Sequence, residues 1–232
     1  MGDCRRLSRN RLGVCQVTAG VSRVGAAFHN GSTTQRLFEI IASKNAQERC
    51  IVEQCDISSD ESITSFIGRL RIALGKGMML GNVVLNAGVL KYQGRATEVS
   101  FSDFALHLHT NTVGPIIGAR KLLDPSVDYP PPKIIFISSD SGSATRFLDF
   151  EDEFGAFAAS KSALNQILRH MAAELQRSDQ KKRGTVILAL HPGGPGWEVK
   201  GSISPSESVS AILHVVSEKG EGDSGTFWCW NG

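Results

Sequence analysis

Short apolar runs alternate with longer amphipathic stretches along this chain of 232 residues, and this alternation restricts its fold more than any other feature. Runs rich in β-branched and aromatic residues predict buried strands, whereas apolar residues repeated every three or four positions predict helices. Strands that alternate with helices form a parallel sheet with helices on both faces. We therefore expect an α/β fold, a single doubly wound domain of the Rossmann type over residues 14–232, preceded by a ragged N-terminal segment, 1–13.

The expected strands and helices follow one another in a regular order. Strands are expected at residues 14–18, 50–55, 83–85, 133–138, 185–190 and 225–230. Helices are expected at residues 59–74, 102–123, 154–177 and 206–217, the first of them capped by Ser59. Because the strand at 133–138 is β-branched or aromatic from Ile134 to Ile137, we expect it to be buried on both faces.

Composition and charge exclude several classes of partner. No apolar run approaches the roughly 20 residues that a membrane-spanning helix requires. The formal net charge of +2 creates no overall field that would attract nucleic acid or an anionic membrane. The five cysteines are odd in number and form no Cys-x-x-Cys pair, so we expect free thiols in a reducing compartment. We therefore expect a cytoplasmic protein without a nucleic-acid, membrane or metal partner.

The most informative local pattern lies in the expected helix 154–177. Phe157 and Lys161 are four positions apart, so they share one helix face. A tyrosine at position 157 could pass a proton to a carbonyl oxygen while the lysine ammonium lowered the pKa of the phenol. Phe157 has a ring but no hydroxyl. In a purely structural interpretation, it fills an apolar stripe that continues through Leu164, Leu168, Met171 and Leu175.

The run 156–165 resembles the Tyr-x-x-x-Lys active-site helix of the short-chain dehydrogenase/reductase family, with Phe157 in place of the tyrosine. Other family-like motifs follow in family order over residues 14–232. They are Asn86-Ala87-Gly88, Asn111, Ser138-Ser139 and His191-Pro192-Gly193. The C-terminal segments Ser224–Phe227 and Asn231-Gly232 resemble the branch of sniffer-like and C-factor-like carbonyl reductases.

This resemblance implies a catalytic set of Ser139, Lys161, Asn111 and the degenerate position Phe157. By resemblance, Ser139 hydrogen-bonds the substrate oxygen, while Lys161 and Asn111 maintain a proton path through water. Donors aimed at a developing oxyanion contribute several kcal/mol in a dry site. In the structural alternative, Ser139 bonds local backbone at a strand end and Asn111 makes a buried structural bond. Loss of a general acid typically lowers the rate by about 10²- to 10⁴-fold.

The segment Thr18–Gly25 resembles the family's glycine turn, in which the backbone approaches a pyrophosphate at a helix N-terminus. Val24 and Ala26 occupy two of the glycine positions if the turn is aligned on Ser22-Arg23, so a degraded loop stays an alternative. The resemblance implies a cofactor site whose residues are Gly20, Ser22, Arg23, Gly25, Asp56, Asn86, Ala87, Gly88, Lys161, Pro192 and Gly193. Arg23 favours NADP(H), because arginine suits a 2′-phosphate, and NAD(H) stays open.

The segment between Gly25 and Asp56 is short for this fold. Two helices and two strands with short loops would need roughly 40 residues, more than the segment provides. We expect the second strand and part of a helix of the nucleotide half to be missing or shortened. An error in the gene prediction would equally explain this gap and the early C-terminus.

The resemblance implies an NAD(P)(H)-dependent oxidoreductase that acts on a carbonyl or alcohol group of a small molecule. We expect a homodimer with impaired or altered turnover, because Phe157 lacks the hydroxyl. Two alternatives stay open, namely a binding protein of the same fold without redox turnover, and a non-redox isomerase, dehydratase or cyclase that uses the same pocket. The residues leave the substrate undetermined.

Overall fold

The computed structural model describes residues 15–19, 23–28, 33–75, 80–91, 95–124, 130–145, 153–178, 184–193 and 203–232. The predicted N-terminal segment 1–13 lies outside them, as do Gly20 and Ser22. Within these ranges the strands form a seven-stranded sheet in the order β3-β2-β1-β4-β5-β6-β7. Their bounds are β1 Cys15–Ala19, β2 Arg23–Phe28, β3 Cys50–Gln54, β4 Val83–Leu85, β5 Lys133–Ile137, β6 Val186–His191 and β7 Thr226–Cys229.

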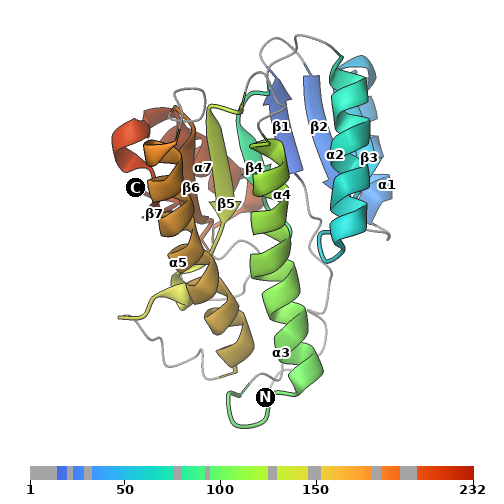
Figure 1. Cartoon of the computed structure of the whole chain (residues 1–232). Helices are drawn as coiled ribbons and strands as arrows, with labels where there is room; N and C mark the ends of the chain where they lie inside the picture. Colours follow the sequence, from blue (N-terminus) through green and yellow to red (C-terminus); the bar gives the residue numbers. More distant parts are fainter. Residues whose placement is uncertain are drawn as a thin grey trace.

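Helices cover both faces of this sheet, as the alternation predicts. The α-helices are α1 Thr33–Ser43, α2 Asp60–Leu74, α3 Phe101–Leu108, α4 Gly114–Leu122, α5 Gly155–Arg177 and α7 Pro205–Glu218. Short helical segments are η1 Gln47–Arg49, η2 His109–Val113, η3 Asp140–Gly142 and η5 Glu221–Asp223. Figure 1 shows α2, α4 and α5 side by side in front of the sheet and α7 behind it. In the described part of the chain, no helix has the length and apolar character that a membrane crossing requires.

The strands β4 to β7 pair in parallel, with Leu85 opposite Phe136 and Ile137 opposite Leu190. In β5, alternate side chains enter two different hydrophobic clusters. Phe136 packs with the cluster of α2, α4 and α5, and Ile135 packs with Val215 of α7 on the other face. Both β5 side chains are fully buried, which confirms the prediction that this strand is covered on both faces.

The structure corrects the prediction for the first third of the chain. The segment Arg23–Phe28, expected to contain a glycine turn and a helix start, is strand β2. Gly25 lies opposite Val17 of the antiparallel β1 and opposite Ile51 of the parallel β3. The strand expected to be missing between Gly25 and Asp56 is therefore β2, and a helix, α1, follows it.

The shortening lies instead between β1 and β2, where the three residues 20–22 leave no room for a helix. As a result β1 runs antiparallel to both of its neighbours, β2 and β4, although the rest of the sheet is parallel. The physical reason is that residues 24–28 are a short apolar run, which is compatible with a buried strand. The ladder hydrogen bonds offered by β3 outweigh the turn preference of its glycine.

Candidate active site

Three parallel strands end at the same edge of the sheet and bring the predicted catalytic motifs together there. After β4 the chain continues into Asn86-Ala87-Gly88, after β5 into Ser138-Ser139, and after β6 into Pro192-Gly193. The carboxyl ends of parallel strands are where ligands bind in open α/β sheets. Helix α5 packs against this region and carries Lys161.

Lys161 is a buried cation, with only 4% of its surface exposed. Its ammonium donates a hydrogen bond to the carbonyl oxygen of Ile137, the last residue of β5, at 2.8 Å. The ammonium nitrogen also lies 5.8 Å from the centre of the Phe157 ring, within the range of a cation–π contact. The predicted sharing of one helix face by the two side chains is therefore confirmed.

Phe157 occupies the tyrosine position of the motif as part of an aromatic pair. Its ring meets the ring of Phe154 edge to face, with centroids 6.5 Å apart and an interplanar angle of 75°. The residue therefore lies beside Lys161 and packs against Phe154, and its place in the apolar stripe stays a prediction. The Phe157 ring can make a cation–π contact with the Lys161 ammonium, but it has no hydroxyl proton to donate.

Asn111 is fully buried and connects two elements of the site. Its Oδ1 accepts the backbone N–H of Val89 at 2.7 Å, and its Nδ2 donates to the Val89 carbonyl at 2.9 Å and to Ser160 Oγ at 3.0 Å. Asn111 lies in the π-helical segment η2, which interrupts the single helix predicted at 102–123. These bonds hold the loop after β4 against α5. The water-holding role of Asn111 stays a prediction.

Ser160 is a structural member of the site that the sequence analysis missed. It is fully buried, donates to the Phe157 carbonyl at 2.7 Å and accepts from Asn111. Thr112 donates from its hydroxyl to the Ser160 carbonyl at 2.7 Å, so η2 and α5 are joined twice. The signal was weak, because Ser160 lies beside the apolar stripe and periodicity alone does not show that it is buried.

The loop 86–88 tests whether this edge suits the nicotinamide end of a dinucleotide. A Cβ added to Gly88 would lie 3.3 Å from Asn111 Oδ1 and 3.7 Å from Lys161 Nζ. The backbone of this loop therefore comes close to both polar side chains, and a larger residue would fill the space beside them. Asn86, Ala87, Gly88 and Lys161 are thus compatible with a ribose and a nicotinamide ring, and this contact stays a prediction.

The phosphate end is different from the prediction. Gly20 and Ser22 lie outside the described residues, and Arg23 and Gly25 belong to β2. Since β1 leads into β2 without a helix, Gly25 does not stand at a helix N-terminus where a pyrophosphate would be bound. The described residues do not form the expected phosphate site, and their contact with the nicotinamide end of the cofactor stays a prediction.

Asp56, predicted to meet the adenine ring, closes the turn between β3 and α2. Its Oδ1 accepts hydrogen bonds from the backbone N–H of Ser58 at 2.9 Å and from the Ser58 hydroxyl at 2.6 Å. The Asp56 N–H donates to Ser62 Oγ at 2.8 Å. The side chain therefore has a local structural role, and its contact with adenine stays a prediction.

The neighbouring thiol of Cys55 is not a nucleophile at neutral pH. Burial, and next the Asp56 carboxylate, raise the pKa of this thiol to about 11. Cys50 and Cys55 form no disulfide, and no cluster of histidine, cysteine or carboxylate groups within the described ranges could hold a metal ion.

Ser139 is buried at the end of β5 and begins the short turn η3. Its hydroxyl oxygen accepts the Ser141 N–H at 3.2 Å and lies 3.3 Å from Asp140 Oδ1. The local backbone bond of the structural alternative is therefore present. Contact with a substrate oxygen stays a prediction.

The end of β6 is anchored from the far side of the sheet. The Pro192 carbonyl accepts a hydrogen bond from Ser208 Oγ of α7 at 2.5 Å, and Gly193 is buried. Before this anchor, His191 Nδ1 lies 3.3 Å from Asp140 Oδ1. The predicted site included Pro192 and Gly193 but neither of these two titratable residues, which are 51 positions apart in sequence.

Comparison with known proteins agrees with this geometry. The sequence profile of the short chain dehydrogenase family matches residues 17–195. An uncharacterized oxidoreductase of Saccharomyces cerevisiae is 26% identical over 201 residues, which are 78% of this chain and 74% of the relative. The crystal structure of an NADPH-bound carbonyl reductase from chicken fatty liver has a TM-score of 0.79 and 25% identity, covering 91% of this chain and 86% of that one. The carbonyl reductase Sniffer of D. melanogaster shares the fold, with a TM-score of 0.75 and 23% identity. The match covers 91% of this chain and 86% of that one.

Proposed function

Because the chain belongs to the short-chain dehydrogenase family, we propose that it is an oxidoreductase that exchanges hydride between a nicotinamide cofactor and a carbonyl or alcohol group of a small molecule. The observation that carries this proposal is the buried Lys161 ammonium at the edge where β4, β5 and β6 end. A buried cation is costly unless the site uses or pairs it. The similar carbonyl reductase that binds NADPH supports a nicotinamide cofactor.

In the proposed complex, the loop 86–88 and Lys161 hold the ribose and the nicotinamide ring, and Pro192 and Gly193 border the ring from β6. When bound, the cofactor supplies the hydride. Ser139 Oγ donates to the carbonyl oxygen, and the Lys161 charge stabilises the negative charge that develops there. The low exposure of Ser139 and Lys161 makes both interactions stronger than they would be in water.

The altered phosphate end predicts a modest affinity for the cofactor, because no helix N-terminus follows β1 to bind the pyrophosphate. We propose NADP(H) as the preferred cofactor, because the similar carbonyl reductase from chicken fatty liver is NADPH-bound, with NAD(H) as the alternative. Phe157 predicts slow turnover, because it removes the phenol that donates the proton in relatives with a tyrosine.

A second candidate function is ligand binding, or a non-redox reaction, in the same pocket. Two observations favour it, namely the apolar packing of Phe157 against Phe154 and the missing helix between β1 and β2. Such a protein would keep the loop 86–88 and lose hydride transfer.

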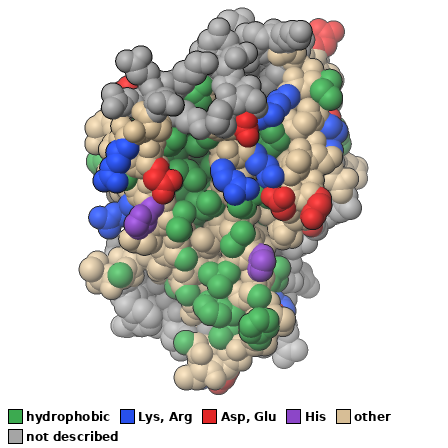
Figure 2. All heavy atoms as spheres, in the orientation of Figure 1, with side chains coloured by type: hydrophobic (Ala, Val, Ile, Leu, Met, Phe, Trp, Pro, Cys, Tyr) green, Lys and Arg blue, Asp and Glu red, His purple; other side chains and the backbone are tan. Residues whose placement is uncertain are grey.

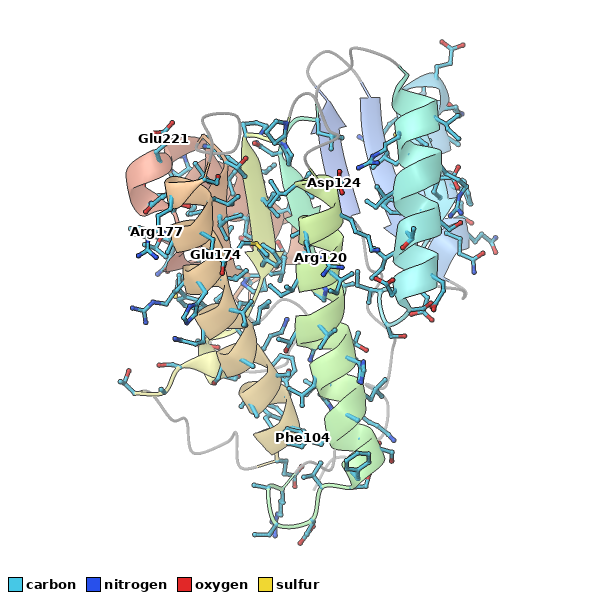
Figure 3. All side chains as sticks on the ribbon, viewed as in Figure 1. Phe104, Arg120, Asp124, Glu174, Arg177 and Glu221 are labelled. Atoms are coloured by element: carbon cyan, nitrogen blue, oxygen red, sulfur yellow. The ribbon has the colours of Figure 1, made fainter. Side chains whose placement is uncertain are left out.

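We also propose that the protein is a cytoplasmic homodimer. The face formed by α3, η2 and α5 exposes large apolar side chains (Figure 2), among them Phe101, Phe104, Val113 and Ile167. Opposite charges lie farther along α5 and on α4, which follows η2 (Figure 3), with Arg120 in α4, Asp124 just after it, and Glu174 and Arg177 on α5. A face that carries apolar groups and both charges suits a twofold contact with a second copy. The reduced thiols of Cys50 and Cys55 suit a reducing compartment.

The proposed oxidoreductase function is tested by a paired experiment. NADPH and NADH binding is measured by calorimetry or fluorescence, and the parent protein and Phe157→Tyr are then assayed on a panel of aldehydes and ketones. We expect binding by both proteins, slow turnover by the parent, and turnover about 10²-fold faster in Phe157→Tyr because the phenol restores a general acid. Absence of cofactor binding by both proteins would refute the proposal. Turnover by the tyrosine variant alone would favour the second candidate function.

A further inference from the structure

Three side chains at the ends of β5 and β6 form a continuous chain of polar contacts. Ser139 Oγ lies 3.3 Å from Asp140 Oδ1, and the same carboxylate oxygen lies 3.3 Å from His191 Nδ1. All three side chains are mostly shielded from solvent, with Asp140 exposed by 22% and His191 by 16%. The Ser139 end of this chain is the hydroxyl that meets the substrate oxygen in the proposed function.

His191 Nδ1 has a second partner, which makes the contact useful for moving a proton. The Asp140 backbone N–H donates to Nδ1 at 3.3 Å. A ring without a proton on Nδ1 accepts this N–H, whereas a ring with a proton on Nδ1 donates to the Asp140 carboxylate. Nδ1 therefore has a partner within the same residue in both of its protonation states.

We propose that Asp140 and His191 form a proton relay that resupplies the Ser139 hydroxyl, and that this relay replaces the missing tyrosine phenol. The inference rests on the proposed oxidoreductase function, because it concerns the proton that a substrate oxygen gains when a carbonyl is reduced. In this scheme Ser139 touches the substrate, and Asp140 and His191 act through it.

The proton balance of the reduction is complete. A bound reduced nicotinamide would supply two electrons as hydride, so that the substrate carbonyl carbon would gain hydrogen and its oxygen would gain the negative charge. The Ser139 O–H bond breaks as a new O–H bond forms on the substrate oxygen. Ser139 Oγ then takes a proton from Asp140 Oδ1, which takes one from His191 Nδ1–H. The imidazole is left neutral and accepts the Asp140 N–H until solvent reprotonates it.

The surrounding structure holds the relay in place. Gly142 of the η3 turn is pressed against α5, since an added Cβ would lie 2.8 Å from the backbone carbon of Lys161. Ser162 Oγ donates to the Gly142 carbonyl at 2.9 Å. Distances of 3.3 Å are long for a proton transfer, but contacts of this kind commonly shorten when the substrate is bound.

The elements next to the end of β6 carry titratable groups of their own. The register partner of His191 on β7 is Cys229, and η3 contributes Asp140. On α5, Lys161 packs its backbone against η3 and directs its ammonium to the Ile137 carbonyl. The Asp140 carboxylate is a charged group in contact with the ring, and its removal is the direct perturbation.

The first test needs neither substrate nor cofactor. The pH titration of the His191 ring is followed by NMR in the parent protein, with the signal assigned by its loss in His191→Asn. In Asp140→Asn, we expect the midpoint of the His191 titration to fall by about one pH unit, because an opposite charge that stabilises the imidazolium is lost. The exposed pair His214–Glu218, whose atoms are also 3.3 Å apart, is the internal control and should titrate unchanged. An unchanged His191 midpoint would overturn the relay.

The second test measures kcat against pH for His191→Asn in the parent background and in the Phe157→Tyr background. Asparagine can bond at the position of Nδ1 but cannot ionise. We expect kcat to fall by about 10²-fold in the parent background, with loss of the histidine-dependent limb of the pH profile. In the Phe157→Tyr background, the fall should be less than about threefold, because the phenol then supplies the proton. His214→Gln should leave kcat unchanged in both.

The outcomes separate the relay from the proposed function. A parent protein that turns over and keeps its kcat and pH profile in His191→Asn would overturn the relay alone. Equal losses in the two backgrounds would also overturn it, since they would show a merely structural role. A parent protein that binds no cofactor and reduces no carbonyl would refute the proposed function and the relay together, whatever the NMR titration shows.

Discussion

The two ends of the sheet differ in how well they match the predicted pattern. From β4 to β7 the strands are parallel, and the loops at their carboxyl ends are tied to the helices by buried hydrogen bonds of Asn111, Ser160 and Lys161. At the other end of the sheet, strand β1 runs antiparallel to β2, and only three residues lie between these two strands. The part of the sheet with the predicted catalytic motifs therefore matches the predicted α/β pattern. The part predicted to bind the phosphates does not. Four experiments, taken from the largest expected effect to the smallest, test this contrast.

Core packing against strands β4 to β6 is tested by Leu168→Ala in α5. Leu168 is 1% exposed and belongs to the cluster that covers β4 to β6. We expect the free energy of unfolding to fall by about 3 kcal/mol, because the truncation leaves a cavity. Ile72→Ala in α2 is the control and should change it by less than about 1 kcal/mol, since Ile72 is 83% exposed. Denaturant unfolding measures both, and equal losses would contradict the assigned packing.

The tie between η2 and the loop after β4 is tested by Asn111→Ala. This change leaves the N–H and the carbonyl of Val89 without their side-chain partner. We expect a loss of about 2 kcal/mol in unfolding free energy, the penalty for buried groups left unsatisfied. Amide exchange at Val89 should become faster than at residues of β5. A Val89 amide that stays as protected as in the parent would contradict this role.

The contrast between the two ends is tested directly by a matched pair of glycine substitutions. Gly88→Ala places a Cβ 3.3 Å from Asn111 Oδ1, so we expect the affinity for NADPH to fall by about tenfold, or 1.4 kcal/mol. Gly25→Ala lies within strand β2 and should leave the affinity unchanged, because alanine is tolerated where a strand rather than a phosphate turn is formed.

Fluorescence titration with NADPH measures both variants. If Gly25→Ala weakens binding more than Gly88→Ala, then Gly25 approaches the cofactor closely and the assignment of the two ends is wrong.

The smallest effect concerns Cys55, at the end of β3. Burial and the Asp56 carboxylate raise the pKa of its thiol from 9.0 to about 11. The folded protein therefore holds this proton more tightly than the unfolded chain, so the stabilisation is complete below pH 9 and is lost as the pH rises to about 11. We expect this loss to be about 1 kcal/mol, less than the full shift implies, because water can approach the thiolate as it forms. Unfolding measured at pH 8 and pH 10.5 should differ less in Cys55→Ala than in the parent, and an equal difference would contradict the prediction.

Much of the part of the fold built on strands β4 to β7 was predictable from the sequence. Strand β5 was predicted at 133–138 and lies at Lys133–Ile137, and α5 was predicted at 154–177 and lies at Gly155–Arg177. Apolar periodicity and flanking turn residues encode such elements locally. Because parallel strands end at one edge of a sheet, the order of motifs was enough to place Gly88, Ser139 and Lys161 near one another.

Contacts between distant segments were not predictable in this way. Asp140 and His191 are 51 residues apart and meet only because β5 and β6 are neighbours with a defined register. Asn111 was recognised by its motif, but its bonds to Val89 and Ser160 depend on the wider π-turn of η2.

The alternation of strands and helices by itself determined the fold family of this chain, together with the edge of the sheet where the polar motifs gather. Only the tertiary structure decided that Arg23–Phe28 is a strand rather than a phosphate-binding turn. The physical reason is that a glycine-containing apolar run has no strong local preference. Hydrogen bonds to β1 and β3, which lie elsewhere in the sequence, therefore select its conformation.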